Sequence, residues 1–383
     1  MKSPILLLER AWRNAIVYPL LRLVIRNQPI TLPLDLHKIR SVLILRYDKI
    51  GDMIVTLPIL KMLRERNPGL RLDILASEVN EEIVRGCEYV DNVFVVQKNP
   101  LLFFRELRRI RKARYEVVLN FIFNRMTSGA LISNFLCRKA VKIGLGQEKY
   151  RFYFNGLLSI PRGTIHMVEM LVRFVEEVFG FSVAAEEKRM FFRVTQEVVN
   201  RVDQFLGKNG LVRRTGSTGT VVKYVVFNVS ARQENKRLSV AQSAAIARFL
   251  GEDPQMKTVV VFAPEDRFEA RQVVTEAKSN RCLLFPEEGS ASLAETAWLI
   301  EGAYYVITPD TAIVHIASAV GTPVLGIFTP LQVNEEWYPY GVKYVLVKAA
   351  ERKPVRSISP ETIINGIRKF NGELSQEVIA REQ

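Results

Sequence analysis

Two aspartates stand in a turn directly after an apolar run near the start of the chain. The run "VLIL" covers residues 42–45, and "RYDKIGDMIVTLP" follows it with Asp48 and Asp52. A strand that ends in such a turn and leads into a helix is typical of the ligand-binding edge of an α/β sheet. A dinucleotide site would carry three glycines at this place. Asp52 is therefore a candidate for chemistry, for capping the helix that follows, or for both.

A second candidate site lies in residues 308–330, "TPDTAIVHIASAVGTPVLGIFTP". We expect a strand that ends in a Pro-Asp turn, followed by a helix that begins at Thr311. Exposed N–H groups and the dipole at a helix start attract phosphate. Asp310 would repel phosphate, so it either accepts hydrogen bonds from sugar hydroxyls or caps the helix. His315 lies one turn inside on the same face, and is either a hydrogen-bonded core residue or a functional one.

Two further loops follow strands in the second half of the chain. The loop "NVSARQENKRLS" contains Lys236 and Arg237, whose cations could neutralise a diphosphate leaving group or could simply be solvated. The loop "FAPEDRFEA" contains Glu265 and Asp266. One of them stands where nucleotide folds often bind ribose hydroxyls, although acidic residues are also common in the first turn of a helix.

The elements that must position these residues are short β-branched runs that alternate with helical periodicity. Such alternation predicts an α/β protein with parallel sheets covered by helices on both faces. The pattern restarts after a break, which predicts two Rossmann-like, doubly wound sheets. The expected strands are 42–45, 72–75, 93–96 and 116–121 in the first half, and 224–229, 258–263, 282–285, 304–308 and 323–328 in the second.

The changes in composition divide the chain into five segments. The stretch "RRTGSTGT" marks a flexible connection within the linker region. We expect an amphipathic N-terminal segment that lies on a membrane surface or packs on the domain, a first Rossmann-like domain, the linker, a second Rossmann-like domain, and a C-terminal helix and tail. Their ranges are 1–37, 38–180, 181–222, 223–350 and 351–383.

The charge balance favours an anionic partner. The chain has 54 lysines and arginines against 40 acidic residues, a net charge of 54 − 40 = +14. Nucleic acid, anionic lipid and a phosphorylated substrate all fit this charge. Nucleic-acid binding rests on charge alone, because no aromatic residues are arranged as a stacking platform. The arginine-rich stretch 103–116 indicates a solvated helix.

The cysteines indicate neither a disulfide framework nor a zinc site. Cys87, Cys137 and Cys282 lie far apart without a CxxC pair, and the chain has only three histidines. We expect reduced, mostly buried thiols and a cytoplasmic protein. No metal is implied by the motifs.

The N-terminal stretch is rich in leucine, isoleucine and arginine. Its longest uncharged piece, residues 14–21, is far shorter than the roughly 18 apolar residues that would cross a bilayer. Arginines opposite Trp12, Tyr18 and leucines predict short amphipathic helices. These helices either lie in a membrane interface or pack on the domain.

Two long stretches resemble the ADP-heptose:lipopolysaccharide heptosyltransferases, family 9 of the glycosyltransferases. They are "LILRYDKIGDMIVTLPILKMLRERNP" and "SLAETAWLIEGAYYVITPDTAIVHIASAVGTPVLGIFTP", and the resemblance spans about residues 40–330. It implies a GT-B fold, in which two Rossmann-like domains face a cleft. The resemblance further implies that the first domain, 38–180, lies on the acceptor side and that the second, 223–350, binds the nucleotide-sugar. It also implies an inverting transfer that needs no metal or other cofactor, with a nucleotide-sugar donor such as an ADP-sugar.

The resemblance also assigns roles to residues. It implies that Asp52 is the general base and that Lys236 binds phosphate, with Asp310 on the transferred sugar and Glu265 near the ribose. Ala312 stands where the family usually has glycine, and its N–H would still face the diphosphate. The donor-binding candidates are Lys236, Glu265, Asp310, Thr311, Ala312 and His315, and the acceptor-side candidates are Asp48 and Arg46.

The expected function is the transfer of heptose or a similar sugar to a lipopolysaccharide core or another envelope glycan. The acceptor would be anionic and lipid-linked, with the protein peripheral on the inner face of the cytoplasmic membrane and without nucleic acid as a partner. Two alternatives stay open. One is a nucleotide-sugar epimerase on the same fold, and the other is a non-catalytic scaffold at the membrane surface.

Overall fold

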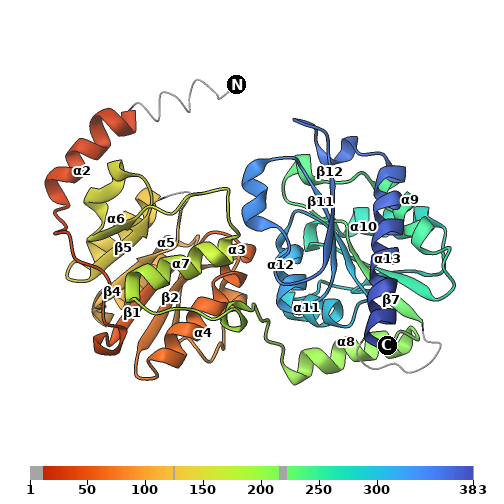
Figure 1. The fold of residues 1–383 in the computed structure, drawn as a ribbon, viewed down its shortest axis with the longest axis horizontal. Helices are drawn as coiled ribbons and strands as arrows, with labels where there is room; N and C mark the ends of the chain where they lie inside the picture. The colour runs from red at the N-terminus through yellow and green to blue at the C-terminus, as the bar shows by residue number, and fades with distance from the viewer. Residues whose placement is uncertain (1–11, 124–125, 215–221, 383) are drawn as a thin grey trace. The chain divides into compact units, whose positions relative to one another are not determined.

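The computed structural model describes residues 12–123, 126–214 and 222–382. The chain forms two compact units, each built around one sheet (Figure 1). The first unit comprises residues 1–49, 59–161 and 169–188. The second comprises residues 50–58, 162–168 and 189–383. The short segment 50–58, which contains Asp52, therefore groups with the second unit.

The first unit contains a six-stranded parallel sheet in the order β3-β2-β1-β4-β5-β6. Its central strands are runs of valine, leucine and isoleucine that are buried on both faces, as expected for a parallel sheet with helices on each side. The strands are β1 Ser41–Leu45, β2 Arg71–Ser77, β3 Asn92–Val96, β4 Val117–Asn120, β5 Val141–Leu145 and β6 Gly156–Leu158.

Helices flank this sheet and connect its strands. Helix α5 begins after Asn99, whose side chain accepts hydrogen bonds from the N–H groups of Leu101 and Leu102. The helices and short helical turns are η1 Arg13–Val17, α2 Tyr18–Val24, η2 Leu36–Lys38, α4 Leu57–Arg66, η3 Glu81–Ile83, α5 Pro100–Ala113, α6 Met126–Leu136, η4 Glu148–Tyr153, α7 Met167–Phe179 and η5 Glu186–Lys188.

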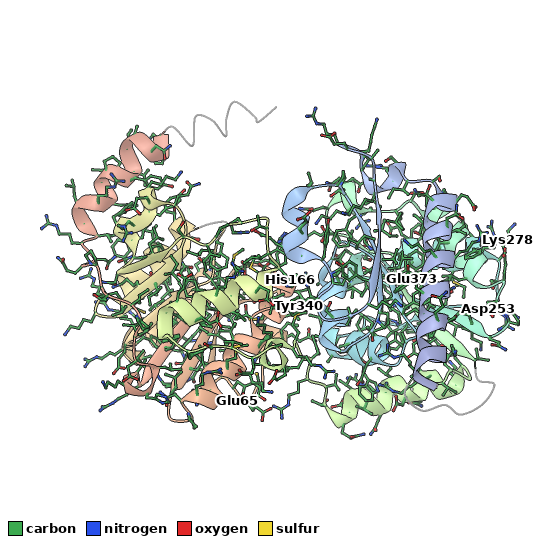
Figure 2. All side chains as sticks on the ribbon, viewed as in Figure 1. Glu65, His166, Asp253, Lys278, Tyr340 and Glu373 are labelled. Atoms are coloured by element: carbon green, nitrogen blue, oxygen red, sulfur yellow. The ribbon has the colours of Figure 1, made fainter. Side chains whose placement is uncertain are left out.

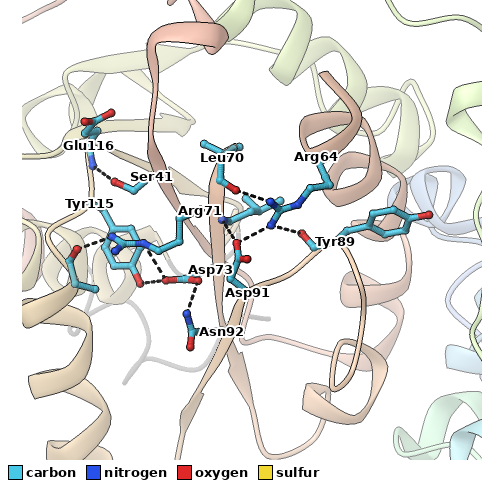
Figure 3. Close-up of polar contacts among 12 residues, drawn as sticks. Ser41, Arg64, Leu70, Arg71, Asp73, Tyr89, Asp91, Asn92, Tyr115 and Glu116 are labelled. Atoms are coloured by element: carbon cyan, nitrogen blue, oxygen red, sulfur yellow. Dashed lines mark hydrogen bonds and ion pairs between the residues drawn. The ribbon is translucent and has the colours of Figure 1, made fainter. Parts of the chain in front are cut away.

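A buried carboxylate in β2 is fully hydrogen-bonded (Figure 3). Asp73 accepts from the Tyr115 hydroxyl at 2.5 Å and from the Asn92 amide at 3.0 Å. Arg71 lies 3.7 Å away and adds a positive charge. Burial and the neighbouring carboxylate raise the pKa of the Tyr115 hydroxyl. Because a buried charge is costly without such partners, this network is a structural part of the first unit.

The second unit repeats the same topology. Its six parallel strands follow the order β12-β11-β10-β7-β8-β9. Counted within each unit and read from one edge, both sheets have the doubly wound order 3-2-1-4-5-6. The strands are β7 Lys223–Asn228, β8 Met256–Val261, β9 Cys282–Phe285, β10 Val306–Pro309, β11 Val324–Phe328 and β12 Tyr344–Lys348.

The long C-terminal helix α13 covers one part of this sheet. Its apolar side chains join the core that contains Leu325 and Val347 of the sheet. The helices and turns of the second unit are α3 Ile50–Ile54, α8 Gln196–Lys208, η6 Glu234–Lys236, α9 Val240–Leu250, η7 Pro264–Asp266, α10 Arg267–Ala277, α11 Leu293–Glu301, α12 Ala312–Ala319, η8 Gln332–Trp337, η9 Val355–Ser357 and α13 Pro360–Glu382.

Helix α2 packs on the first unit through one face. Tyr18 and Ile25 are buried in a cluster with Ala130 of α6 and Tyr153 of η4. Among the residues that the structure describes, no helix has the length and apolar character needed to cross a bilayer.

The structure confirms the predicted α/β class with two doubly wound parallel sheets. Every strand expected from the sequence is present within two residues of its predicted limits. Three edge or near-edge strands, β5, β6 and β12, were not predicted. The three cysteines are free and buried, as expected.

Candidate active site

The sheet of the second unit reverses its strand order between β7 and β10, and the predicted donor-binding loops leave the sheet there. In open α/β sheets, ligands bind outside the carboxyl ends of the strands at this point. Asn228, the last residue of β7, donates from its amide to the Thr308 hydroxyl at 3.0 Å and to the Thr311 hydroxyl at 3.1 Å. One buried side chain therefore fixes the two loops to each other.

Helix α12 begins at this edge with a well-formed N-terminus. Thr311 is the N-cap, and its hydroxyl accepts from the N–H of Ile313 at 3.3 Å. Ala312 is the first residue of the helix, where N–H groups have no partner within the helix. The alternative in which Asp310 caps the helix is wrong, because Thr311 takes that position.

Lys236 and Asp310 form an ion pair beside this helix start. The Lys236 ammonium lies 2.5 Å from the Asp310 carboxylate, and both side chains are largely buried. Lys236 ends the turn η6, which follows β7, while Asp310 follows β10. The fold thus brings a cation, a carboxylate and a helix N-terminus to one place.

The two carboxylates after β8 have different environments. Asp266 is buried and pairs with the guanidinium of Arg237, which also donates to the carbonyl of Ala231 at 2.7 Å. Glu265 is exposed to solvent. Asp266 therefore holds the loop that contains Lys236 and Arg237 in place. Glu265 is the carboxylate that can reach a ligand.

His315 is buried on α12 behind the helix start. Burial, together with the charge of Lys236, lowers the pKa of its imidazole to about 4, so the ring is neutral near neutral pH. Its Nδ1 atom makes no hydrogen bond to the part of the chain that the structure describes. The Trp337 ring meets it edge to face at 5.6 Å. A neutral, buried imidazole fits a packing role as well as a polar one.

Helix α3, also part of the second unit, packs against α12 through a glycine. A Cβ atom on Gly51 would lie 2.5 Å from Cδ2 of His315, closer than real carbon atoms approach. Asp52 follows directly and is buried. It is the third residue of α3, so the alternative in which it caps this helix is wrong. The glycine allows the close approach that sets the position of Asp52.

The acceptor-side candidates lie in the first unit, where its own sheet reverses order between β1 and β4. Arg46 is fully buried, and its guanidinium donates to the carbonyl of Phe121 and lies 3.5 Å from the Asp48 carboxylate. The Asn80 amide donates to the carbonyl of Arg46 at 2.9 Å. Arg46 therefore connects the loop after β1 to the loop after β4. Asp48 is the more accessible residue of the pair.

A second set of contacts, not expected from the sequence, anchors residues 162–168. Arg162 binds the buried Glu336 carboxylate through two hydrogen bonds of 2.7 Å. His166 stacks on Tyr340 at 4.5 Å, and both residues are labelled in Figure 2. The Nε2 atom of His166 lies 3.0 Å from the carbonyl of Tyr338. The partners come from far along the chain, so no local pattern could have revealed these pairs.

Asn228, at the carboxyl end of β7, is a residue of this sheet edge that the sequence analysis did not single out. The available signal was a polar side chain at the end of the buried run "YVVFN". A polar residue that ends a central parallel strand points at the ligand edge of the sheet.

The sequence profile of "Glycosyltransferase family 9 (heptosyltransferase)" matches residues 103–364, which is more than half of the chain. The chain belongs to glycosyltransferase family 9. A Haemophilus influenzae protein to which a glycosyltransferase activity has been ascribed is 22% identical over 311 residues, covering 78% of this chain and 86% of that protein.

Solved structures of family 9 share the fold. The family 9 glycosyltransferase of Veillonella parvula gives a TM-score of 0.73 at 18% identity, covering 90% of this chain and 100% of that one. Escherichia coli heptosyltransferase WaaC with ADP gives 0.64 at 18% identity, covering 87% and 99%. ADP-heptose lipopolysaccharide heptosyltransferase II of E. coli gives 0.66 at 16% identity, covering 88% and 99%. The two doubly wound units are thus the Rossmann-like pair of a GT-B glycosyltransferase.

Proposed function

We propose that this family 9 glycosyltransferase transfers a sugar, heptose or similar, from a nucleoside-diphosphate donor to an anionic, lipid-linked envelope glycan, with inversion at the anomeric carbon. The observation that carries the proposal is the convergence of Lys236, Asp310 and the start of α12 at the strand-order reversal of the second sheet. The solved E. coli relative WaaC is described with ADP, which supports an ADP-sugar as the donor.

The donor diphosphate would lie against the N–H groups of Thr311 and Ala312. Lys236 already pairs with Asp310, but an ammonium has three N–H donors and can bridge the carboxylate and a phosphate. Asp310 would in turn face the hydroxyls of the transferred sugar, and the exposed Glu265 would reach the ribose. His315, neutral and buried, would support the helix start from behind.

In the proposed reaction Asp52 is the general base. Its carboxylate takes the proton of the acceptor hydroxyl while that oxygen forms a bond to the anomeric carbon. The bond from this carbon to the diphosphate oxygen breaks on the opposite face, and its electron pair leaves with the nucleoside diphosphate. Lys236 and the helix N-terminus then stabilise the developing negative charge, a task that metal ions perform in other transferases.

The acceptor would approach the first unit, with Asp48 as the accessible contact and Arg46 holding the loop. A lipid-linked acceptor requires the enzyme to work at a membrane surface, which we place at the inner face of the cytoplasmic membrane. The net charge of +14 and the arginine-containing N-terminal helices support contact with anionic lipid.

A thermal-shift panel of nucleoside diphosphates and nucleotide-sugars tests the donor site. A ligand that binds only the folded state raises the free energy of unfolding by about 2.7 kcal/mol at 100 times its dissociation constant. We expect selective stabilisation by ADP or an ADP-sugar. Stabilisation by a different nucleotide would mean that the donor carries a base other than adenine. No stabilisation by any of them would contradict the proposed transferase and favour a scaffold.

A further inference from the structure

Helix α5 of the first unit presents a continuous outer face that the proposed reaction does not use. Leu101, Arg105, Arg108 and Lys112 recur at intervals of four, three and four residues, so they form one stripe along the helix. All are exposed, whereas Ile110 on the opposite face is buried in the core of the unit.

The N-terminal end of this stripe is apolar. Leu101 is 80% exposed and Phe104, one turn further, is 63% exposed. Asn99 caps the helix through the N–H of Leu101, which fixes the backbone that carries these side chains. Two large apolar side chains held out on a well-formed helix end indicate a contact surface.

The rest of the stripe is cationic and carries more positive than negative charge. The sequence of α5 contains one acidic residue, Glu106, which is buried and pairs with Arg109 at 2.8 Å and with Arg105 at 3.7 Å. One carboxylate therefore stands against five cations on this helix. The outer cations Arg105, Arg108 and Lys112 thus continue directly from the apolar end.

The neighbouring helices of the same unit also expose apolar and cationic side chains. Helix α6 packs against α5 through Leu136 and against α2 through Ala130, so it lies between them. It exposes Phe135, and the arginine and lysine that follow at 138 and 139 are exposed as well. On α2 and the turn before it, the exposed apolar residues are Trp12, Ile16, Leu20, Leu23 and Val24.

We propose that the outer face of α5, continued by α6 and α2, binds an anionic lipid bilayer. Protruding apolar side chains enter the boundary between headgroups and acyl chains, and adjacent cations pair with anionic headgroups. The inference deepens the proposed function, because it states which surface would bring the enzyme to a lipid-linked acceptor.

Vesicle co-sedimentation of the full chain tests the electrostatic part. We expect binding to vesicles of phosphatidylcholine with phosphatidylglycerol, and little binding to phosphatidylcholine alone. The triple variant Arg105→Gln, Arg108→Gln, Lys112→Gln should lower the partition coefficient on the order of 100-fold, since each cation near an anionic surface contributes about tenfold or less. The matched control Arg271→Gln, Lys353→Gln, Lys369→Gln removes three exposed charges from the second unit.

The control should bind almost as well as the unchanged protein. Equal losses in the two triple variants would show that net charge alone, and not this face, drives binding. Failure of the unchanged protein to bind anionic vesicles would also overturn the proposal.

A dye attached at position 104 tests insertion without relying on the triple variant. The three native cysteines are buried, so Phe104→Cys offers a selective labelling site, and Phe268→Cys offers a matched one at an aromatic residue that is 69% exposed in the second unit. An environment-sensitive dye at position 104 should show a blue-shifted emission with anionic vesicles, while a dye at 268 should not. No shift at 104, or the same shift at both positions, would contradict the proposal.

Nucleotide binding separates this inference from the proposed function. The α5 variants should keep the thermal shift with ADP while losing vesicle binding. Vesicle binding without any nucleotide stabilisation would overturn the transferase proposal and leave the lipid surface intact. Nucleotide stabilisation without vesicle binding would overturn the lipid surface and leave the transferase proposal intact.

Discussion

Asp48 and Asp52 stand four residues apart in the sequence but have different surroundings. Asp48 lies near the buried Arg46 in the first unit and is partly accessible. Asp52 is buried within α3, which groups with the second unit. The proposed base is thus the carboxylate that belongs to the same unit as Lys236 and Asp310.

Replacing Asp52 by asparagine keeps the size of the side chain and removes the base. We expect a roughly 10²–10⁴-fold lower transfer rate, because this is the usual contribution of a placed general base. The thermal shift with ADP should be unchanged. Asp48→Asn is the matched control and should change the acceptor KM more than kcat. Full turnover in the Asp52→Asn variant would remove Asp52 from this role.

Replacing Lys236 by alanine removes the cation and leaves the Asp310 carboxylate without this partner. We expect donor binding to weaken about 10- to 100-fold, since hydrogen bonds to charged groups contribute about 1.5–3 kcal/mol. Lys236→Arg should keep part of the affinity, and Lys353→Ala, an exposed lysine in the second unit, should change nothing. Isothermal titration with ADP measures each value. Equal affinity in Lys236→Ala and the unchanged protein would return Lys236 to a structural role.

His315 makes stability depend on pH in a predictable direction. Its folded pKa of about 4 lies below the ordinary value of about 6.5, so between these values the unfolded chain binds more protons than the folded one. The stabilisation is complete above about pH 6.5 and is lost as the pH falls toward about 4. Lowering the pH from about 7 to about 5 should cost about 2 kcal/mol through this one residue.

The variant His315→Asn should remove this contribution. Its melting temperature should therefore fall less than that of the unchanged protein between about pH 7 and about pH 5, while other titrating groups affect both proteins alike. Identical pH dependence in the two proteins would show that His315 is not held neutral by burial.

At the scale of elements, the contact between α3 and α12 depends on Gly51. An added methyl group would overlap the His315 ring, so Gly51→Ala should lower the stability of the folded protein by about 1–3 kcal/mol. Gly372→Ala in α13 is the matched control, because a Cβ there meets nothing within 4 Å. It should be neutral or slightly stabilising, since alanine favours helices over glycine. Equal melting temperatures for the two variants would mean that α3 is not packed against His315.

Sequence patterns predicted most of the strands but not all of them. Long runs of β-branched residues such as "YVVFNV" and "TVVVFA" predicted their strands, because burial on both faces demands such runs. Strand β5, "VKIGL", carries Lys142 as its second residue and was missed. That lysine is buried and donates to the carbonyls of Arg138 and Ala140 at 2.9 and 2.8 Å, so backbone oxygens just before the strand satisfy its ammonium.

The candidate site was predictable in its parts but not in its pairings. Strand–turn–helix patterns placed Asp52 and Asp310 at sheet edges, because parallel strands end at one side. The ion pair between Lys236 and Asp310, the bridge by Asn228 and the contact of Gly51 with His315 join residues far apart in sequence. Such contacts depend on strand order, which no local periodicity encodes.

At the scale of the whole molecule, two units with the same strand order each place polar residues where that order reverses. The first unit holds Arg46 and Asp48 there, and the second holds Lys236, Asp310 and Thr311. In the proposed function, the first of these edges serves the acceptor and the second serves the donor.

The most direct test of this account is acceptor-dependent release of nucleoside diphosphate from an ADP-sugar, measured with EDTA present. The account predicts release that requires a lipopolysaccharide-core acceptor, continues in the chelator and yields a product with inverted anomeric configuration. Conversion of the donor at the same rate without acceptor, or a product of retained configuration, would contradict it.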